Sequence, residues 1–135
     1  MSDSARVLAP RQGERFGPAE KLRRSADFSR VQRGGQRLAG TFIVVVGRRG
    51  AAPWTRIGLT VSRKIGPAVL RNRVKRRLRD VFRRNKMAFF AYLDVVVIAR
   101  SGAANVDYAS LRDEVLLLIG KLGKRLHLNT MPEKT

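Results

Sequence analysis

The residues best suited to chemistry are the basic side chains of one stretch, Thr60 to Lys86, with the sequence TVSRKIGPAVLRNRVKRRLRDVFRRNK. Its apolar residues recur every three or four positions, which predicts one face of a helix that begins near Pro67. Most other positions are basic, and the only acid is Asp80. Because neighbouring like charges repel, such a helix favours a polyanionic partner, above all a nucleic acid backbone. The side chains predicted to contact it are Arg63, Lys64, Arg71, Asn72, Arg73, Lys75, Arg76 and Arg79.

Two other interpretations of this helix are weaker. Ordinary solvated helix faces mix positive and negative charges, and this one does not. A helix lying on an anionic membrane has a broad apolar face, whereas this stripe is narrow and is needed for a core. The role of Asn72 stays open between a hydrogen bond to RNA and a cap on the local backbone.

The sequence shows no arrangement of side chains that would support independent phosphodiester hydrolysis. Such hydrolysis needs clustered carboxylates that hold metal ions, or paired histidines for acid–base catalysis. The acids are scattered apart from Asp113 and Glu114, and the one histidine, His127, has no evident partner. We therefore predict no catalytic residue and no metal site in the protein itself, and interpret His127 as a surface residue.

Composition supports a single nucleic-acid-binding domain. The chain has 135 residues, a hydrophobic content of 44% and a formal net charge of +19. This charge is larger than solubility alone requires, and it indicates a polyanionic partner. There is no cysteine, and no apolar run reaches the length of a membrane span. The N-terminus lacks the apolar core of a signal peptide, so we expect a cytoplasmic protein with no membrane partner.

The remaining elements follow from periodicity and turn residues. The pattern predicts helix, strand, strand, helix, strand, helix, which indicates an α+β sandwich with a mainly antiparallel sheet. The first two strands are expected to form an antiparallel pair because their connection is short. We expect one domain over 20–128, with a flexible basic arm at 1–19 and a flexible tail at 129–135. The predicted elements are helices at 25–33, 67–90 and 108–126, with Ser25 as a plausible N-cap of the first, and strands at 37–47, 55–62 and 93–99.

The basic stretch also resembles a known family. Val61 to Val69 (VSRKIGPAV), followed by Arg71-Asn72-Arg73 and then VKRRLR, is similar to the RNR signature of the bacterial ribonuclease P protein subunit. The resemblance covers about 21–126. It implies a small two-layer α/β sandwich with a left-handed β-α-β crossover at the basic helix.

The resemblance further implies a function. In this family the RNA subunit, with its Mg²⁺ ions, removes the 5′ leader of precursor tRNA. The protein binds the catalytic RNA and the leader, and raises the affinity for substrate and metal. The leader lies in a groove between the first helix and the sheet, where aromatic residues contact it. The positions here that match or flank this groove are Phe28, Arg30, Val45 and Ser62.

Some of these positions depart from the family pattern. Gln32 and Val45 stand where relatives often carry aromatic residues, so contact through backbone, Arg30, Ser62 and the RNR helix is favoured over strong base stacking. Phe28 could be either a groove residue or a core residue. Composition alone also fits a structural RNA-binding protein of ribosomal type or a DNA-compacting protein, and only the RNR context separates these classes.

Overall fold

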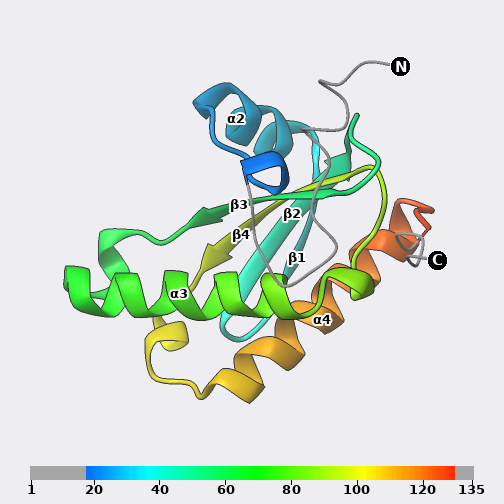
Figure 1. Ribbon diagram of the computed structural model, residues 1–135. Coiled ribbons are helices and arrows are strands. Elements are labelled where there is room, and N and C mark those ends of the chain that lie inside the picture. Colours follow the sequence, from blue (N-terminus) through cyan, green and yellow to red (C-terminus); the bar gives the residue numbers. More distant parts are fainter. Residues whose placement is uncertain (1–17, 130–135) are drawn as a thin grey trace.

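The computed structural model describes residues 18–129, and these form one α+β unit (Figure 1). Three α-helices and four strands alternate with short 3-10 turns. The predicted strand at 93–99 is confirmed, and the first and last helices are confirmed to within one residue. The elements are η1 (Pro18–Glu20), α2 (Ser25–Gly34), β1 (Gln36–Ala39), β2 (Ile43–Arg49), β3 (Thr55–Thr60), η2 (Arg63–Ile65), α3 (Ala68–Arg84), η3 (Lys86–Ala88), β4 (Leu93–Ala99), η4 (Ser101–Ala104) and α4 (Tyr108–Arg125).

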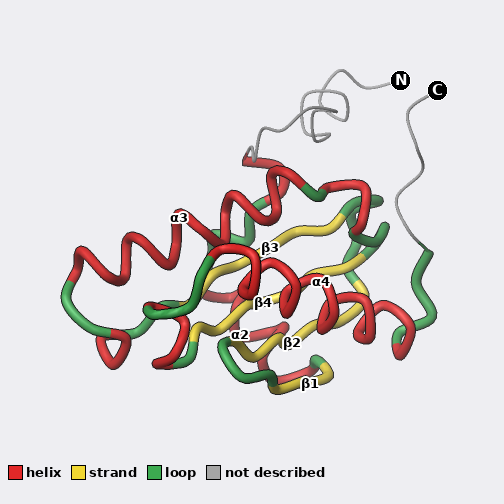
Figure 2. The backbone as a smooth tube through the Cα atoms, turned by 90° about the horizontal axis from the view of Figure 1, so that it is seen from below, coloured by secondary structure: helices red, strands yellow, loops and turns green. Residues whose placement is uncertain are grey.

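The four strands form one mixed sheet in the order β1-β2-β4-β3 (Figure 2). β2 runs antiparallel to both β1 and β4, while β3 pairs with β4 in parallel. The sheet is therefore mainly antiparallel, as predicted. The parallel pair makes β3, α3 and β4 a β-α-β crossover, as the resemblance implies, and its left hand stays a prediction.

Two predictions about the strands are wrong. The run at 37–47 is not one strand, because the chain turns at Gly40, whose N–H donates to the carbonyl of Ile43 (2.8 Å). The strands β2 and β3 are not an antiparallel pair either, since β4 lies between them. The short connection between β2 and β3 suggested a hairpin, but β4 arrives from later in the chain and pairs with both.

Helix ends also differ from the sequence prediction. Arg24 occupies the N-cap of α2, so Ser25 is its first residue and does not cap it. The basic helix begins one residue after Pro67 and ends at Arg84 instead of continuing to about residue 90. It ends there because the Asn85 side chain donates to the carbonyl of Val81 (2.7 Å) and a 3-10 turn follows.

Helices cover both faces of the sheet, so the predicted sandwich gains a layer made of α2 alone (Figure 1). The larger core lies between the sheet and the helices α3 and α4, and contains Ile43, Val45 and Val97 from the sheet. The smaller core lies under α2, where Val31 packs against Val44, Val46 and Val96. Both faces of β2 and β4 are thus buried, which explains their nearly continuous apolar sequences.

The turn η1, which includes two residues of the predicted arm, packs against the rest of the described unit. Pro18 and Ala19 belong to the packed unit, because the indole N–H of Trp54 donates to the Ala19 carbonyl (2.8 Å). The adjacent Glu20 is buried and pairs with Lys86 (3.1 Å). The remainder of the predicted arm, 1–17, and the tail from 130 lie outside the described residues.

Candidate nucleic-acid interface

The helix α3 has one buried face and one basic face. Val74, Leu78, Val81 and Phe82 are buried against the sheet and α4, as the apolar period predicts. The opposite face is solvent-exposed and carries Asn72, Arg73, Arg76, Arg79 and Arg84. This amphipathic packing fixes the helix on the core, so that its outer face presents cations at a fixed spacing.

A tight turn joins β3 to this helix. Ile65 is buried and anchors η2, and Gly66 follows with φ 142°, a conformation that a residue with a side chain rarely adopts. The Arg71 side chain donates from Nε to the Gly66 carbonyl (3.2 Å). The turn therefore holds Arg63 and Lys64, both exposed, beside the first turn of α3.

The basic residues of α3 differ in what their side chains contact. Arg77 donates to the Val106 carbonyl (2.5 Å), and Arg83 pairs with Asp80 (3.1 Å), so these two serve the fold. In the described part of the chain, Arg73, Lys75, Arg76 and Arg79 form no ion pair and no hydrogen bond through their side chains. These four cations are available to an external anion.

The side chain of Asn72 is exposed, and within residues 18–129 it makes no hydrogen bond. Pro67 occupies the N-cap position of α3, and no side chain makes a capping hydrogen bond there. Of the two roles left open by the sequence, a local backbone cap is therefore not observed, and Asn72 lies among the free cations.

The residues expected to border the leader groove lie on α2 and along β3. Phe28 projects from α2 onto Gly58 so closely that a Cβ atom at position 58 would lie 2.5 Å from its Cζ. The ring also packs against the smaller core, yet it is only half-buried. Phe28 therefore belongs in part to the smaller core, and its contact with the leader stays a prediction.

The prediction that Val45 lines this groove is wrong. Val45 is 0% exposed and lies in the larger core, on the face of the sheet opposite α2. Its neighbours Val44 and Val46 face α2 instead, because successive residues of a strand point to opposite faces. Ser62 is exposed beyond the end of β3, and Arg30 is exposed on α2.

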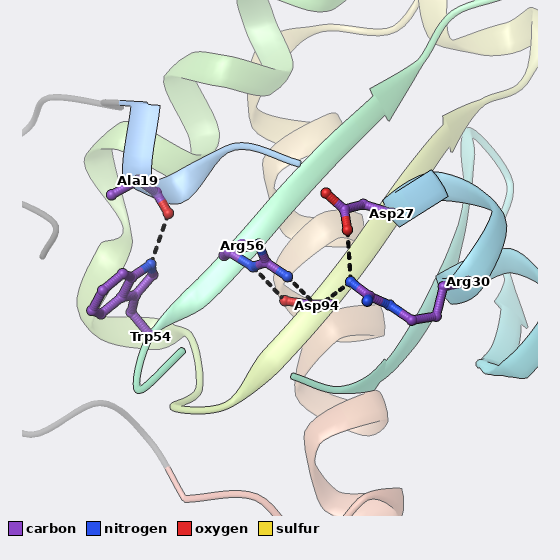
Figure 3. Close-up of polar contacts among 6 residues, drawn as sticks. All are labelled: Ala19, Asp27, Arg30, Trp54, Arg56 and Asp94. Carbon is purple, nitrogen blue, oxygen red and sulfur yellow. Dashed lines mark hydrogen bonds and ion pairs between the residues drawn. The ribbon is translucent and has the colours of Figure 1, made fainter. Parts of the chain in front are cut away.

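A second polar cluster, missed in the sequence, lies near the start of β3 (Figure 3). Arg56 binds the buried carboxylate of Asp94 through Nε (2.9 Å) and an η-nitrogen (2.7 Å). This hydrogen bonding raises the pKa of Arg56 above its ordinary value, against the opposing effect of burial. Arg30 pairs with Asp27 at 2.7 Å and lies 4.0 Å from Asp94. Arg56 and Gly58 are two residues apart in β3 and therefore share one face of the strand. This alternation was the signal in the sequence that could have placed Arg56 beside the predicted groove residues.

Metal-ligating clusters are absent from residues 18–129, where no three Asp, Glu or His side chains gather. His127 is exposed and follows α4 with φ 56°. No helix within the same residues is both long and apolar enough to cross a membrane.

The sequence and the fold of this chain match those of a known protein family. The family model described as Ribonuclease P matches residues 16–123. The chain belongs to this family. A ribonuclease P protein component from Syntrophobacter fumaroxidans is 41% identical over 109 residues, covering 80% of this chain and 92% of the relative. One from Citrifermentans bemidjiense is 36% identical over 110 residues, covering 82% and 94%.

Solved structures of ribonuclease P proteins have the same fold. The RNase P protein from Thermotoga maritima superposes with a TM-score of 0.70 at 35% identity, covering 76% of this chain and 96% of that one. The RNase P protein of Staphylococcus aureus superposes with a TM-score of 0.68 at 32% identity, with the same coverage. The α+β fold predicted for the ribonuclease P family is thus confirmed.

Proposed function

We propose that this chain is the protein component of a ribonuclease P and acts in tRNA 5′ processing by binding RNA. The observation that carries the proposal is the outer face of α3, where Arg73, Lys75, Arg76 and Arg79 have no acidic partner among the described residues. Such cations can neutralise the phosphates of a nucleic acid backbone, and Arg can bind a phosphate through two nitrogens.

Two RNA partners use two adjacent surfaces. The catalytic RNA subunit binds the outer face of α3 and the η2 turn, through Arg63, Lys64 and the free cations. The 5′ leader of precursor tRNA lies in the groove along β3, between the Phe28 ring and Ser62. The turn at Gly66 joins the two surfaces, so that one rigid unit holds both RNAs in register.

Hydrolysis belongs to the RNA subunit in this proposal. The described residues offer no carboxylate cluster and no histidine pair that could activate water. The Mg²⁺ ions that the resemblance implies would be held mainly by the RNA. The protein's part is to neutralise phosphates where the two RNAs meet, which raises the affinity for substrate and for metal.

A structural protein of ribosomal type is not favoured. The family match spans nearly all of the described residues and includes the turn before α3 as well as the helix itself. Such a protein would bind RNA with no effect on the cleavage of precursor tRNA.

The direct test is leader removal at low Mg²⁺ by catalytic RNA with and without the protein. We expect the protein to stimulate cleavage, and RNA-free protein alone to cleave nothing. Replacing Arg73 and Arg76 by Ala should weaken binding to the catalytic RNA, while the fold survives because both residues are exposed. Replacing Lys121 and Lys124 on α4 removes the same charge elsewhere and serves as the matched control.

Salt dependence gives the quantitative form of this test. If about six phosphates are neutralised, log K against log salt should have a slope of about −4, at about −0.7 per phosphate for single strands. The Arg73→Ala/Arg76→Ala variant should flatten that slope by about 1.4. An unchanged slope with unchanged stimulation would show that α3 is not the interface.

A further inference from the structure

Three consecutive apolar residues are exposed where the helix α3 begins. Pro67, Ala68 and Val69 follow one another in the sequence and form an apolar patch on the surface. Val69 is 71% exposed, more than any other large hydrophobic side chain in the described residues. The first turn of α3 extends beyond the ends of the strands, so the sheet does not cover this patch (Figure 1).

The fold accounts for two residues of the apolar patch but not for Val69. Pro67 occupies the N-cap position with φ −60°, the angle that its ring fixes, and Ala68 favours a helix. Val69 is β-branched, so it favours a helix less than Lys or Arg would, and Leu70 is the neighbour that packs against the larger core. Because runs of three exposed apolar residues are unfavourable in water, Val69 indicates contact with a partner.

Cations surround the apolar patch. Lys64 is exposed on the η2 turn that precedes it. Asn72 and Arg73 follow Val69 by three and four residues, so they lie on the same side of the helix. Arg76, seven residues after Val69, lies about 10 Å farther along the helix axis. A second copy of this chain, with its net charge of +19, would be repelled here, so the charge selects a polyanion.

The apolar side chain narrows the kind of polyanion. A phosphate gains nothing from contact with the methyl groups of Val69, whereas the face of a base does. In a regular RNA double helix the base faces are covered by stacking, and the surface presents phosphates and 2′-hydroxyl groups. An unpaired nucleotide leaves its base accessible to a side chain. Val69 therefore favours RNA that presents an unpaired base, while the surrounding cations attract any RNA.

We propose that Val69 is a specificity-determining residue, which packs against the base of an unpaired nucleotide in the catalytic RNA. This inference rests on the proposed function, which assigns the outer face of α3 to that RNA. The cations Arg73 and Arg76 supply affinity through phosphates. Val69 supplies part of the preference for the catalytic RNA over regular double-stranded RNA.

The test replaces one methyl group by a hydroxyl group. Val69→Thr keeps the shape of the side chain, and its melting temperature should equal that of the wild type because residue 69 is exposed. Binding is measured to the catalytic RNA and to a regular RNA duplex of about 16 base pairs. We expect binding to the catalytic RNA to weaken about 5-fold, and binding to the duplex to stay unchanged. The slope of log K against log salt should also stay unchanged, since no charge is lost.

Two further variants separate the apolar contact from charge and from position. Val69→Lys adds a cation, so it should strengthen duplex binding and steepen its salt slope by about 0.9, while the preference for the catalytic RNA falls. Leu117 on α4 is 56% exposed and is the other exposed large aliphatic side chain in the described residues. Leu117→Thr is therefore the matched control and should bind both RNAs like the wild type.

The remaining outcomes would overturn the inference in different ways. If Val69→Thr binds the catalytic RNA like the wild type, while Arg73→Ala/Arg76→Ala loses binding, this inference fails and the proposed function stands. Equal weakening for the catalytic RNA and the duplex would exclude the unpaired base. A lower melting temperature would show that Val69 serves the fold, and a loss of self-association with unchanged RNA binding would show that a second copy covers the patch. If the wild type neither stimulates cleavage nor prefers the catalytic RNA, the proposed function itself fails.

Discussion

The contact between Phe28 and Gly58 allows a test in which the ring is displaced without being removed. In Gly58→Ala, the new methyl group would lie 2.5 Å from the ring's Cζ, whereas carbon atoms in contact are separated by about 3.5–4.0 Å. The ring must therefore retreat by about 1 Å. It cannot do so freely, because it also packs against the small core around Val31 and Val96.

The expected cost follows from that displacement. Crowding of this kind costs about 1–3 kcal/mol in the free energy of unfolding. Phe28→Ala alone should cost about 2 kcal/mol, since the ring is half-buried and a fully buried one costs about 3–5 kcal/mol. The double variant should cost little more than Phe28→Ala, because Ala at position 28 leaves room for the methyl group. We expect a coupling of about 1–2 kcal/mol.

Urea denaturation of the four proteins measures this coupling. Binding to precursor and mature tRNA then tests function: both single variants should lose affinity for the precursor, by about 1–3 kcal/mol if a base stacks on the ring, and keep their affinity for mature tRNA. Additive stability losses would refute the packing argument. Equal loss of affinity for both tRNAs would remove Phe28 from the groove.

Two further predictions concern carboxylates that hold the fold. Glu114 on α4 accepts hydrogen bonds from three backbone N–H groups in the turn between β1 and β2 (2.7–2.8 Å), so Glu114→Ala should lower the free energy of unfolding by about 2–4 kcal/mol. Its neighbour Asp113, whose side chain is 69% exposed, is the matched control, and thermal melts should show a loss of at most about 0.5 kcal/mol. Asp94→Ala leaves the half-buried Arg56 without its partner and should cost about 2–4 kcal/mol. Asp94→Leu with Arg56→Met should recover most of that loss in the same melts, and a double variant as unstable as Asp94→Ala would contradict this account.

The elements that the sequence predicts well are those whose signal is local. The run Leu93–Ala99 is apolar apart from Asp94 and is buried on both faces, so its ends were predicted correctly. The stripe on α3 follows from a period of three and four residues, and the buried residues are those that the period selects. The positions that this period leaves on the outside of the helix are mostly basic, so the cation-rich face could be predicted as well.

The features that sequence reasoning missed depend on distant parts of the chain. The turn at Gly40 is stabilised by Glu114, more than 70 residues away, so nothing near it distinguishes one long strand from two short ones. The position of β4 between β2 and β3 is likewise set by long-range pairing. Val45 was placed in the groove by resemblance, although its alternation with Val44 left the choice of face open.

The candidate site was predicted only in part for the same reason. The RNR residues are contiguous in sequence, so their common surface could be inferred. The cluster of Arg56, Asp94 and Arg30 joins α2, β3 and β4, and these residues become neighbours only once β3 and β4 pair in parallel. That pairing brings Asp94 beside Arg56 in register, and α2 then places Arg30 above both.

The parallel pairing also explains how one strand joins the two proposed surfaces. In the crossover, β3 is an edge strand that leads directly into the RNR turn, so residues along its α2 side continue the surface of that turn. On this side Gly58 leaves room for the Phe28 ring to lie directly on the strand, and Ser62 is exposed beyond the strand's end. The proposed leader contacts and the proposed contacts with the catalytic RNA are therefore joined through the turn at Gly66.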